Sequence, residues 1–320
     1  MPQPPFVQRP STRRRIMNLI TSVGHKINEL GSHLGVQSGT TFYVSNATGS
    51  NGVDDQAHGR SPTLPFATIA YAITQCTASK GDVILAGEGH AETVNSAGFV
   101  AMSKAGVTLK GVGYGSSRPT LTWATDTAAT MTVSAAGCRI TNFIFDMSLP
   151  SALVSGIVVS AAQCMIDSCL FKIGTAGTGT RPLQAILTTA AADYLVVQDC
   201  MFIEPTTTPT TVSAASTVIK IVGGTGLKIL RNFFQGWYTT SSGAIACITT
   251  LTSAVEIRDN LIFNQTASST KAITLLTGST GFVVNNRMQI LSGTAPITGD
   301  GVMWAGNYYA AAIATAGTLV

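Results

Sequence analysis

The sequence predicts an all-β fold in which short parallel strands wind into a solenoid, and two observations predict it. A short motif recurs along most of the chain, and the polar residues are mainly small and uncharged. Charged residues make up 11% of the 320 residues and apolar residues 45%. Average chains hold about 25% charged residues, and helical surfaces are rich in Glu, Lys and Arg. The composition therefore disfavours a helical protein and excludes a disordered one.

The first 40 residues are predicted to form a basic arm that is separate from the solenoid. Residues 1–33 hold five Arg or Lys against one Glu, so they carry the whole net charge of +4. The neutral remainder offers no broad basic face for nucleic acid. Apolar residues follow the Arg run at heptad spacing, which predicts a helix that self-associates, docks on a partner or lies on the solenoid. The candidate assembly residues are Arg13, Arg14, Arg15, Ile20, Val23, Ile27 and Leu30.

Residues 41–320 are predicted to form the solenoid, and a short helix is expected to cap its first coil. Four apolar residues from Phe66 onward are spaced i, i+3, i+4 and i+7, which predicts a helix over about 66–76 with one buried face. The coils are expected over about 82–310. The C-terminal tail, residues 308–320, must then cover the last coil or pack on a neighbour, because an open solenoid end exposes core and strand edges.

The recurring motif consists of an apolar residue, two polar residues, Asn or Cys, any residue, and an aromatic or aliphatic residue. It starts at Ile140, Ile166, Val197, Ile229, Ile257, Val284 and Trp304. Its fourth positions are Phe143, Cys169, Cys200, Asn232, Asn260, Arg287 and Asn307. These positions lie 20 to 32 residues apart, which matches one solenoid coil of two or three short strands.

The column of Asn and Cys is interpreted as structural. A sharp bend needs a residue that tolerates an unusual backbone angle and whose side chain bonds the adjacent coils. Asn does both, and Cys is a compact apolar substitute. We therefore expect Cys169 to stack on Cys200, and Cys138 on Cys164, without disulfides.

The segments before the repeat carry a resemblance to known proteins. Gly49-Ser50-Asn51-Gly52, the apolar helix pattern and Gly81-Asp82-Val83-Ile84 resemble the opening of right-handed parallel β-helix proteins of the pectate-lyase-like class. The resemblance covers about residues 42–310 and implies a right-handed parallel β-helix with a capping helix. The Thr- and Ala-rich coils are also similar to bacteriophage virion proteins of this architecture. Because such folds host lyases, hydrolases, adhesins and inert scaffolds, the resemblance is specific for the fold alone.

Catalysis on such a scaffold needs converging carboxylates, either around calcium or around a glycosidic bond. Aligning the repeats stacks Asp199, Arg231 and Asp259 on consecutive coils, and Lys228 on Glu256 one column over. The alternating charges favour a structural ion-pair ladder. An acid pair formed by Asp199 and Asp259 is the fallback catalytic interpretation.

A metal site has one candidate, the adjacent residues Asp54 and Asp55, which lie in a Gly- and Asn-rich loop. The alternative is a solvated loop. No cofactor is expected. Exposed aromatic residues such as Trp237 and Tyr238 beside converging carboxylates would indicate an enzyme or a glycan-binding adhesin.

These observations lead us to expect a non-enzymatic bacteriophage virion structural protein, with capsid decoration as the first choice. The chain is expected to be a homo-oligomer, a trimer, attached through its arm to the capsid or to another virion protein. It would be made in the host cytoplasm and located in the virion, and it would bind neither membrane nor nucleic acid. The alternative is a carbohydrate-active or glycan-binding tailspike, similar to β-helix polysaccharide lyases and hydrolases.

Overall fold

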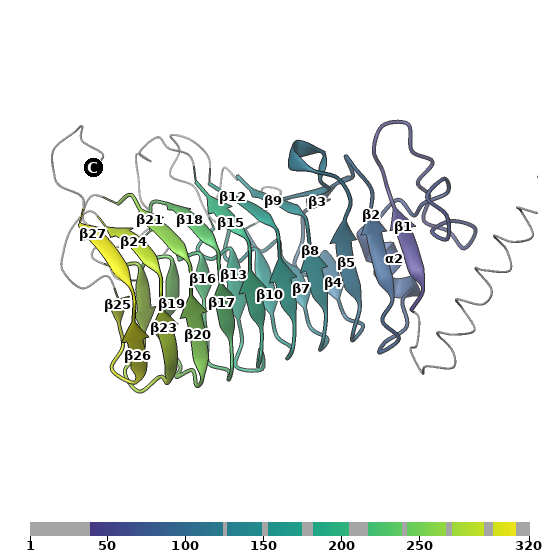
Figure 1. Ribbon diagram of the computed structural model, residues 1–320. Helices are drawn as coiled ribbons and strands as arrows, with labels where there is room; N and C mark the ends of the chain where they lie inside the picture. The colour runs from purple at the N-terminus through teal and green to yellow at the C-terminus, as the bar shows by residue number, and fades with distance from the viewer. Residues whose placement is uncertain are drawn as a thin grey trace, which may run out of the picture. The chain divides into compact units, whose positions relative to one another are not determined.

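The computed structural model describes residues 39–123, 127–148, 153–174, 182–204, 217–238, 242–266, 271–290 and 297–311. The described residues form a right-handed parallel β-helix, as predicted (Figure 1). The predicted arm, with its assembly residues Arg13, Arg14, Arg15, Ile20, Val23, Ile27 and Leu30, lies outside the described residues. Within the described part of the chain, no helix has the length and apolar character needed to span a membrane.

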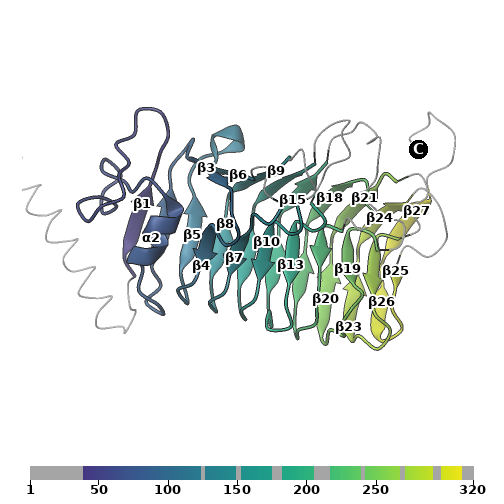
Figure 2. The same ribbon diagram turned by 180° about the vertical axis from the view of Figure 1, so that it is seen from behind.

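Three parallel sheets run along the solenoid, and the chain passes from one to the next in turn (Figures 1 and 2). The first sheet has ten strands, in the order β1 (Thr41–Val44), β2 (Val83–Ala86), β5 (Thr108–Gly111), β8 (Arg139–Thr141), β11 (Met165–Asp167), β14 (Val196–Gln198), β17 (Lys228–Leu230), β20 (Val255–Arg258), β23 (Gly281–Val284) and β26 (Val302–Ala305).

The other two sheets complete each coil. The second sheet has nine strands, β3 (Ala91–Val94), β6 (Thr120–Trp123), β9 (Ile144–Met147), β12 (Leu170–Ile173), β15 (Met201–Ile203), β18 (Phe233–Gly236), β21 (Leu261–Asn264), β24 (Arg287–Ile290) and β27 (Tyr308–Ala311). The third sheet has eight strands, β4 (Val100–Met102), β7 (Met131–Val133), β10 (Ile157–Val159), β13 (Ile186–Thr188), β16 (Ile219–Lys220), β19 (Ile245–Cys247), β22 (Ile273–Leu275) and β25 (Ile297–Thr298).

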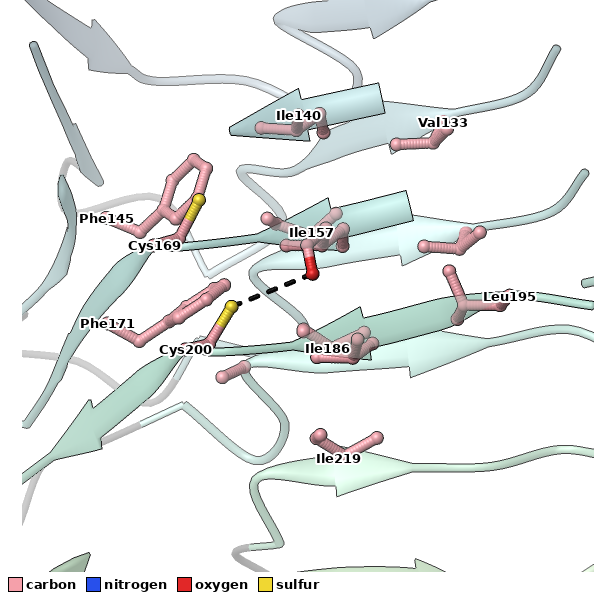
Figure 3. Close-up of a cluster of buried hydrophobic side chains, with 14 of the residues drawn as sticks. Val133, Ile140, Phe145, Ile157, Cys169, Phe171, Ile186, Leu195, Cys200 and Ile219 are labelled. Carbon is pink, nitrogen blue, oxygen red and sulfur yellow. Dashed lines mark hydrogen bonds between the residues drawn. The ribbon is translucent and has the colours of Figure 1, made fainter. Parts of the chain in front are cut away.

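Inward side chains stack in columns along the solenoid and form its core. In the second sheet Phe145, Phe171, Phe202 and Phe234 occupy one column, with successive ring centroids 4.8, 4.4 and 4.8 Å apart. Figure 3 shows two of these rings beside the aliphatic columns of the other sheets. Burial of each such side chain stabilises the fold by about 1.5–3 kcal/mol, so every coil adds its own share of core.

A helix caps the N-terminal end, as predicted, but it is shorter than the predicted span of 66–76. Helix α2 spans Ile69–Gln75, and the Thr68 side chain caps it by accepting the N–H of Tyr71 at 3.2 Å. Its buried residues are Ile69, Ala72 and Ile73. Phe66 is also buried, but it precedes the helix and forms a parallel bridge with Val44 of β1. A 3-10 turn, η1 (Gly115–Ser117), lies between β5 and β6.

The predicted repeat register is wrong for one coil. Val283, and not Val284, pairs with Ile257, so Asn286 takes the fourth position of the motif in place of Arg287. The two alignments differ by one residue within Val-Val-Asn-Asn, a segment in which either choice satisfies the pattern. Only the backbone pairing separates them.

Candidate functional site

The corner between the first and second sheets is the most regular feature of the surface. One residue in each of six coils adopts a left-handed backbone conformation there, with φ between 53° and 62°. These residues are Asn142, Ser168, Asp199, Arg231, Asp259 and Asn285. The sequence interpretation assigned both the unusual backbone angle and the inter-coil bonding to one residue. The structure divides these roles, because the next residue along is the one that points inward.

Asn side chains at that next position form a buried ladder, which confirms the predicted bonding between coils. Asn260 Oδ1 accepts the backbone N–H of Asn232 at 2.9 Å, and its Nδ2 donates to the carbonyl oxygen of Ile229 at 2.9 Å. Asn286 and Asn307 repeat the pattern on the following coils. Each amide therefore satisfies backbone groups that would otherwise be buried without partners.

Cysteine replaces Asn on the earlier coils. Cys200 donates its backbone N–H to Asn232 Oδ1 at 3.0 Å, and its Sγ lies 3.7 Å from the carbonyl oxygen of Ile166 (Figure 3). The strand register stacks Cys169 on Cys200, as predicted. Burial raises the pKa of the Cys200 thiol well above its ordinary value. Such a thiol is a packing group rather than a nucleophile.

The second predicted cysteine stack also forms. Cys138 and Cys164 directly precede the register pair Arg139 and Met165. Burial raises the pKa of Cys138 to about 11. All six cysteines of the chain are free and buried.

The charged residues of the corner form structural ion pairs. Asp199, Arg231 and Asp259 follow paired strands on consecutive coils, as predicted. Arg231 binds both oxygens of Asp199, at 2.8 and 2.7 Å. Asp259 is held instead by Arg258 of its own coil, at 3.2 Å, so the alternating ladder is shorter than expected.

Lys228 and Glu256 pair at 3.3 Å on the neighbouring column, as predicted. Such exposed pairs contribute about 0–1 kcal/mol each. A more buried pair lies on earlier coils, where Arg139 binds both oxygens of Asp167 at 2.8 and 3.0 Å.

The two candidate metal ligands, Asp54 and Asp55, bind different partners. Asp54 accepts the backbone N–H groups of Ala67 and Thr68 at 2.8 and 3.0 Å, next to the start of α2. Asp55 bonds His58 Nδ1 at 2.6 Å, and this bond lowers the pKa of Asp55. Within the described ranges, no three metal-ligating side chains come together.

A buried polar cluster below α2 was missed by the sequence analysis. His90 Nδ1 accepts the N–H of Asn46 at 3.1 Å, so Nε2 carries the proton that bonds Glu92 Oε1 at 2.7 Å. The same carboxylate oxygen accepts the N–H of Ile69 at 2.6 Å. Alternation of His90 and Glu92 along one strand is the only sequence signal for this cluster. Its contacts fasten the capping helix to the first coil.

Two of the hollows on the surface of the described coils bear on the candidate chemistry. One, of about 560 Å³, lies near the last coil and is lined by residues that include Leu275, Ile297, Asp300 and Trp304. The other, of about 330 Å³, lies outside the second sheet and is lined by Ser148, Leu170, Lys172, Gly174, Ile203 and Glu204. Each is lined by a single carboxylate, whereas glycoside cleavage commonly uses two.

The aromatic pair that could have marked an enzyme is not exposed. Tyr238 is buried and Trp237 is partly buried. Four exposed aromatic residues lie on the last coils, Phe282, Trp304, Tyr308 and Tyr309, which are 50%, 38%, 71% and 52% exposed. Tyr114 and Tyr194, which are 93% and 56% exposed, lie on earlier coils.

The outer face of the second sheet carries an apolar stripe. The strand register aligns Leu170, Met201, Phe233 and Leu261 on consecutive coils. Phe263 lies beside Phe233, with ring centroids 5.8 Å apart. Met201 is 45% exposed and the other aligned residues are partly buried.

No protein-family model matches the chain, and no curated protein matches it. A solved structure described as a rhamnogalacturonan lyase is similar over 78% of this chain and 74% of its own, with a TM-score of 0.49 and 11% identity. A likeness at this level carries no information on activity, so the function has to be argued from the residues described above.

Proposed function

We propose that the protein is a non-enzymatic structural component of a bacteriophage particle, a capsid decoration protein held on the particle by its basic arm. One observation carries the proposal. The coil segment from 139 to 266 contains seven carboxylates, and all seven bind a partner. They are Asp146, Asp167, Asp193, Asp199, Glu204, Glu256 and Asp259.

Six of these seven carboxylates bind a residue of an adjacent coil, and Asp259 alone binds within its own coil. A general acid or a nucleophile has to face its substrate, whereas both oxygens of Asp199 face Arg231. The fallback pair of Asp199 and Asp259 therefore has Arg231 between its members. The carboxylates hold coils together, which is the task of a scaffold.

The apolar stripe supports association with further copies of the chain. The stripe runs over four coils of the second sheet. Beside it, Lys172 Nζ forms an ion pair with Asp146 Oδ2 of the adjacent strand at 3.5 Å. The four stripe residues themselves carry no charge, so they can be buried without a desolvation cost for ions, and Arg287 marks the end of the stripe on the next coil. We propose a trimer in which this face packs against its copies, and sedimentation equilibrium of the full chain measures its size.

Attachment through the arm is tested with the full chain on phage particles recovered from the organism that encodes it. The variant changes Arg13, Arg14 and Arg15 to Ser, and the control changes Arg60, Lys80 and Lys110, three exposed cations away from the apolar stripe, to Ser. Both variants lose three charges. The arm variant should lose about tenfold in particle occupancy at low salt and less at high salt, because only the electrostatic part is removed. Equal occupancy of the two variants, or absence of the protein from the particles, would contradict the proposal.

A glycan-binding or carbohydrate-active tailspike is the second candidate, and the exposed aromatic residues of the last coils favour it. Trp304 borders the larger hollow together with Asp300, and Tyr309 is exposed on the same coil. Polygalacturonate and neutral capsular polysaccharides are suitable probes for the full chain. Quenching of Trp304 fluorescence or release of shorter sugars would favour this candidate over the scaffold.

A further inference from the structure

Asn51 is the only asparagine of the chain that is followed by glycine. The pair Asn51-Gly52 lies in the loop between β1 and α2, at the end of the solenoid that carries the capping helix (Figure 1). Neither residue takes part in the Asn ladder or in the ion pairs of the corner. The packing around Gly52 and the surroundings of Asn51 give this pair a chemistry of its own.

The fold requires glycine at position 52. A Cβ there would collide with the carbonyl oxygen of Ser45 and would lie 3.2 Å from the Cα of Ala67. Both neighbours are main-chain atoms, so neither can rotate away as a flexible side chain could. Glycine is the residue that allows such a close approach of two backbones. The residue after Asn51 therefore has no side chain to shield its backbone nitrogen.

The side chain of Asn51 is exposed, and the fold does not hold it. Among the described residues, neither its amide nor the N–H of Gly52 has a hydrogen-bond partner. Asn46 in the same loop differs, because its Nδ2 donates to the carbonyl oxygen of Ala91 at 2.6 Å and its Oδ1 accepts the Ala91 N–H at 2.9 Å. The Asn51 amide is thus free to meet the nitrogen of the next residue.

We propose that Asn51 is a site of spontaneous deamidation. Hydroxide takes the proton of the Gly52 nitrogen, which then bonds to Cγ of Asn51. The Cγ–Nδ2 bond breaks, and the amide leaves as ammonia after taking a proton from water, which regenerates hydroxide. The product is a five-membered succinimide ring. Asparagine is among the residues that limit the chemical lifetime of proteins.

Water then opens the succinimide ring in one of two ways. Cleavage of the bond from the Gly52 nitrogen to Cγ leaves aspartate at position 51. Cleavage of the bond from that nitrogen to the main-chain carbonyl carbon leaves isoaspartate, in which the main chain runs through Cβ and Cγ. In both cases the chain has lost ammonia and gained water, so water is the only co-reactant.

Isoaspartate lengthens the main chain by one atom at a place where both sides are held. Before Asn51, the N–H of Ser50 donates to the carbonyl oxygen of Ala47 at 2.9 Å. After it, the N–H of Val53 donates to the carbonyl oxygen of Pro65 at 3.1 Å. Close-packed surroundings leave no room for an extra atom between these points, so one of the contacts has to break.

The contacts of Asp54 come next along the chain, and they hold the segment that leads into the capping helix. Asp54 accepts the N–H groups of Ala67 and Thr68 at 2.8 and 3.0 Å. Its Oδ2 also accepts the hydroxyl of Thr68 at 2.7 Å. We therefore expect the isoaspartyl form to loosen the start of α2. The inference does not depend on the phage assignment, since it follows from this loop alone.

The site is tested on the full chain by peptide mass mapping after incubation at mildly alkaline pH. The Asn51 peptide should gain about 1 Da, since ammonia is replaced by water, and isoaspartyl methyltransferase should label it. Asn46 should stay unchanged, and Asn95, which is exposed but followed by Ser96, should react more slowly. The rate at Asn51 should rise with pH, because the Gly52 nitrogen has to lose its proton. Unchanged mass at Asn51, or equal rates at Asn51 and Asn95, would overturn the proposal.

The structural consequence is tested by amide hydrogen exchange of Ala67 and Thr68. Exchange should be about tenfold faster or more in the isoaspartyl form than in the fresh chain. Fresh Asn51→Asp is the matched control, because it adds the same charge without lengthening the main chain, and its exchange should stay within about twofold of the fresh chain. Asn51→Gln incubated in the same way should also stay unchanged. Equal exchange in the isoaspartyl form and in Asn51→Asp would show that the loop absorbs the extra atom, which would overturn the expected loosening of α2.

Discussion

The two halves of the buried corner column hold adjacent coils together by different means. In the later coils, Asn232, Asn260, Asn286 and Asn307 satisfy backbone groups of neighbouring coils through their amides. In the earlier coils the same column holds Phe143, Cys169 and Cys200, whose side chains fill space. The backbone bends in the same left-handed conformation in both halves.

The difference shows that the corner needs side chains that fill its interior and hydrogen bonds between adjacent coils. No single residue type has to supply both. In the earlier half, which has no Asn in this column, side chains next to the column form the bonds between adjacent coils. Arg139 and Asp167 bridge two coils there, and the Thr141 hydroxyl also bonds Asp167 at 3.1 Å. In both halves polar groups hold adjacent coils together.

Breaking the Asn ladder should have the largest effect. Asn260→Ala removes the acceptor for the Asn232 N–H and the donor to the Ile229 carbonyl, and both groups remain buried. Each unsatisfied group costs about 1–3 kcal/mol, so the free energy of unfolding in urea should fall by about 3 kcal/mol. Asn51→Ala, at an exposed Asn, is the control. A loss below about 1 kcal/mol would mean that the ladder is not a main support.

Breaking the bridge in the earlier half should have the next largest effect. Arg139→Ala leaves the Asp167 carboxylate, whose side chain is 7% exposed, with hydroxyl partners alone. The free energy of unfolding should fall by about 2 kcal/mol, since a nearly buried charge loses its partner. Arg231→Ala is the matched control, because its Asp199 side chain is 40% exposed and can be hydrated. Equal losses in the two variants would show that burial of the pair does not matter.

Alkaline pH should weaken the packing around Cys138 in the earlier half. Burial raises the pKa of Cys138 from its ordinary value of 9.0 to about 11, so the folded state binds this proton more tightly than the unfolded state. Its contribution to stability is complete below pH 9 and is lost as the pH rises through about 11. Urea unfolding of Cys138→Ala should therefore depend less on pH between 9 and 11 than that of the unchanged chain. The same dependence in both proteins would place the titrating group elsewhere.

Extending the ladder by one rung should change little. In Cys200→Asn the new amide can donate to the Ile166 carbonyl, which already faces the Cys200 sulfur, and to Asn232 Oδ1. We expect the free energy of unfolding, measured by thermal unfolding, to change by no more than about 1 kcal/mol. Asn260→Cys is the reverse exchange and should be destabilising. If both exchanges are equally harmful, the two halves are specialised in a way that the ladder geometry does not explain.

Neutralising the exposed corner pair should have the smallest effect. Asp199→Asn removes one charge from a pair whose side chains are 45% and 40% exposed. Thermal unfolding should report a loss of about 0.5 kcal/mol or less, and the loss should shrink at high salt. A loss above about 2 kcal/mol would require a structural role for Asp199 beyond this pair.

Much of the fold could be predicted from the sequence, because each coil needs apolar residues at the same inward positions. The spacing of apolar positions from Ile140 to Ile257 predicted the inward columns, and the pattern around Ile69 predicted the capping helix. The register at Val283 could not be predicted, since adjacent Val and Asn pairs satisfy two alignments. The division of roles at the corner also stayed hidden, because the motif has polar residues at several successive positions. Five of the six left-handed residues are Asn, Asp or Ser, but Asn also occupies the inward position that follows them.

The candidate site was harder to predict than the fold. The stacking of Asp199 on Arg231 followed from the repeat, but the choice of Arg258 as partner of Asp259 depends on side-chain direction within one strand. The His90 and Glu92 cluster depends on Asn46 and Ile69, which are distant in sequence. Long-range contacts of this kind leave no periodic signal.

A cryo-electron microscopy map of the phage particle tests the central claim, that this β-helix is a scaffold attached by its arm, most directly. We predict β-helices on the capsid surface in groups of three, with the apolar stripe between copies and density from the end that carries α2 reaching the shell. The polar corner with Asp199 and Asp259 should contact no substrate-like density. Single β-helices at the tail tip with sugar density beside Trp304, or particles without the protein, would contradict the account.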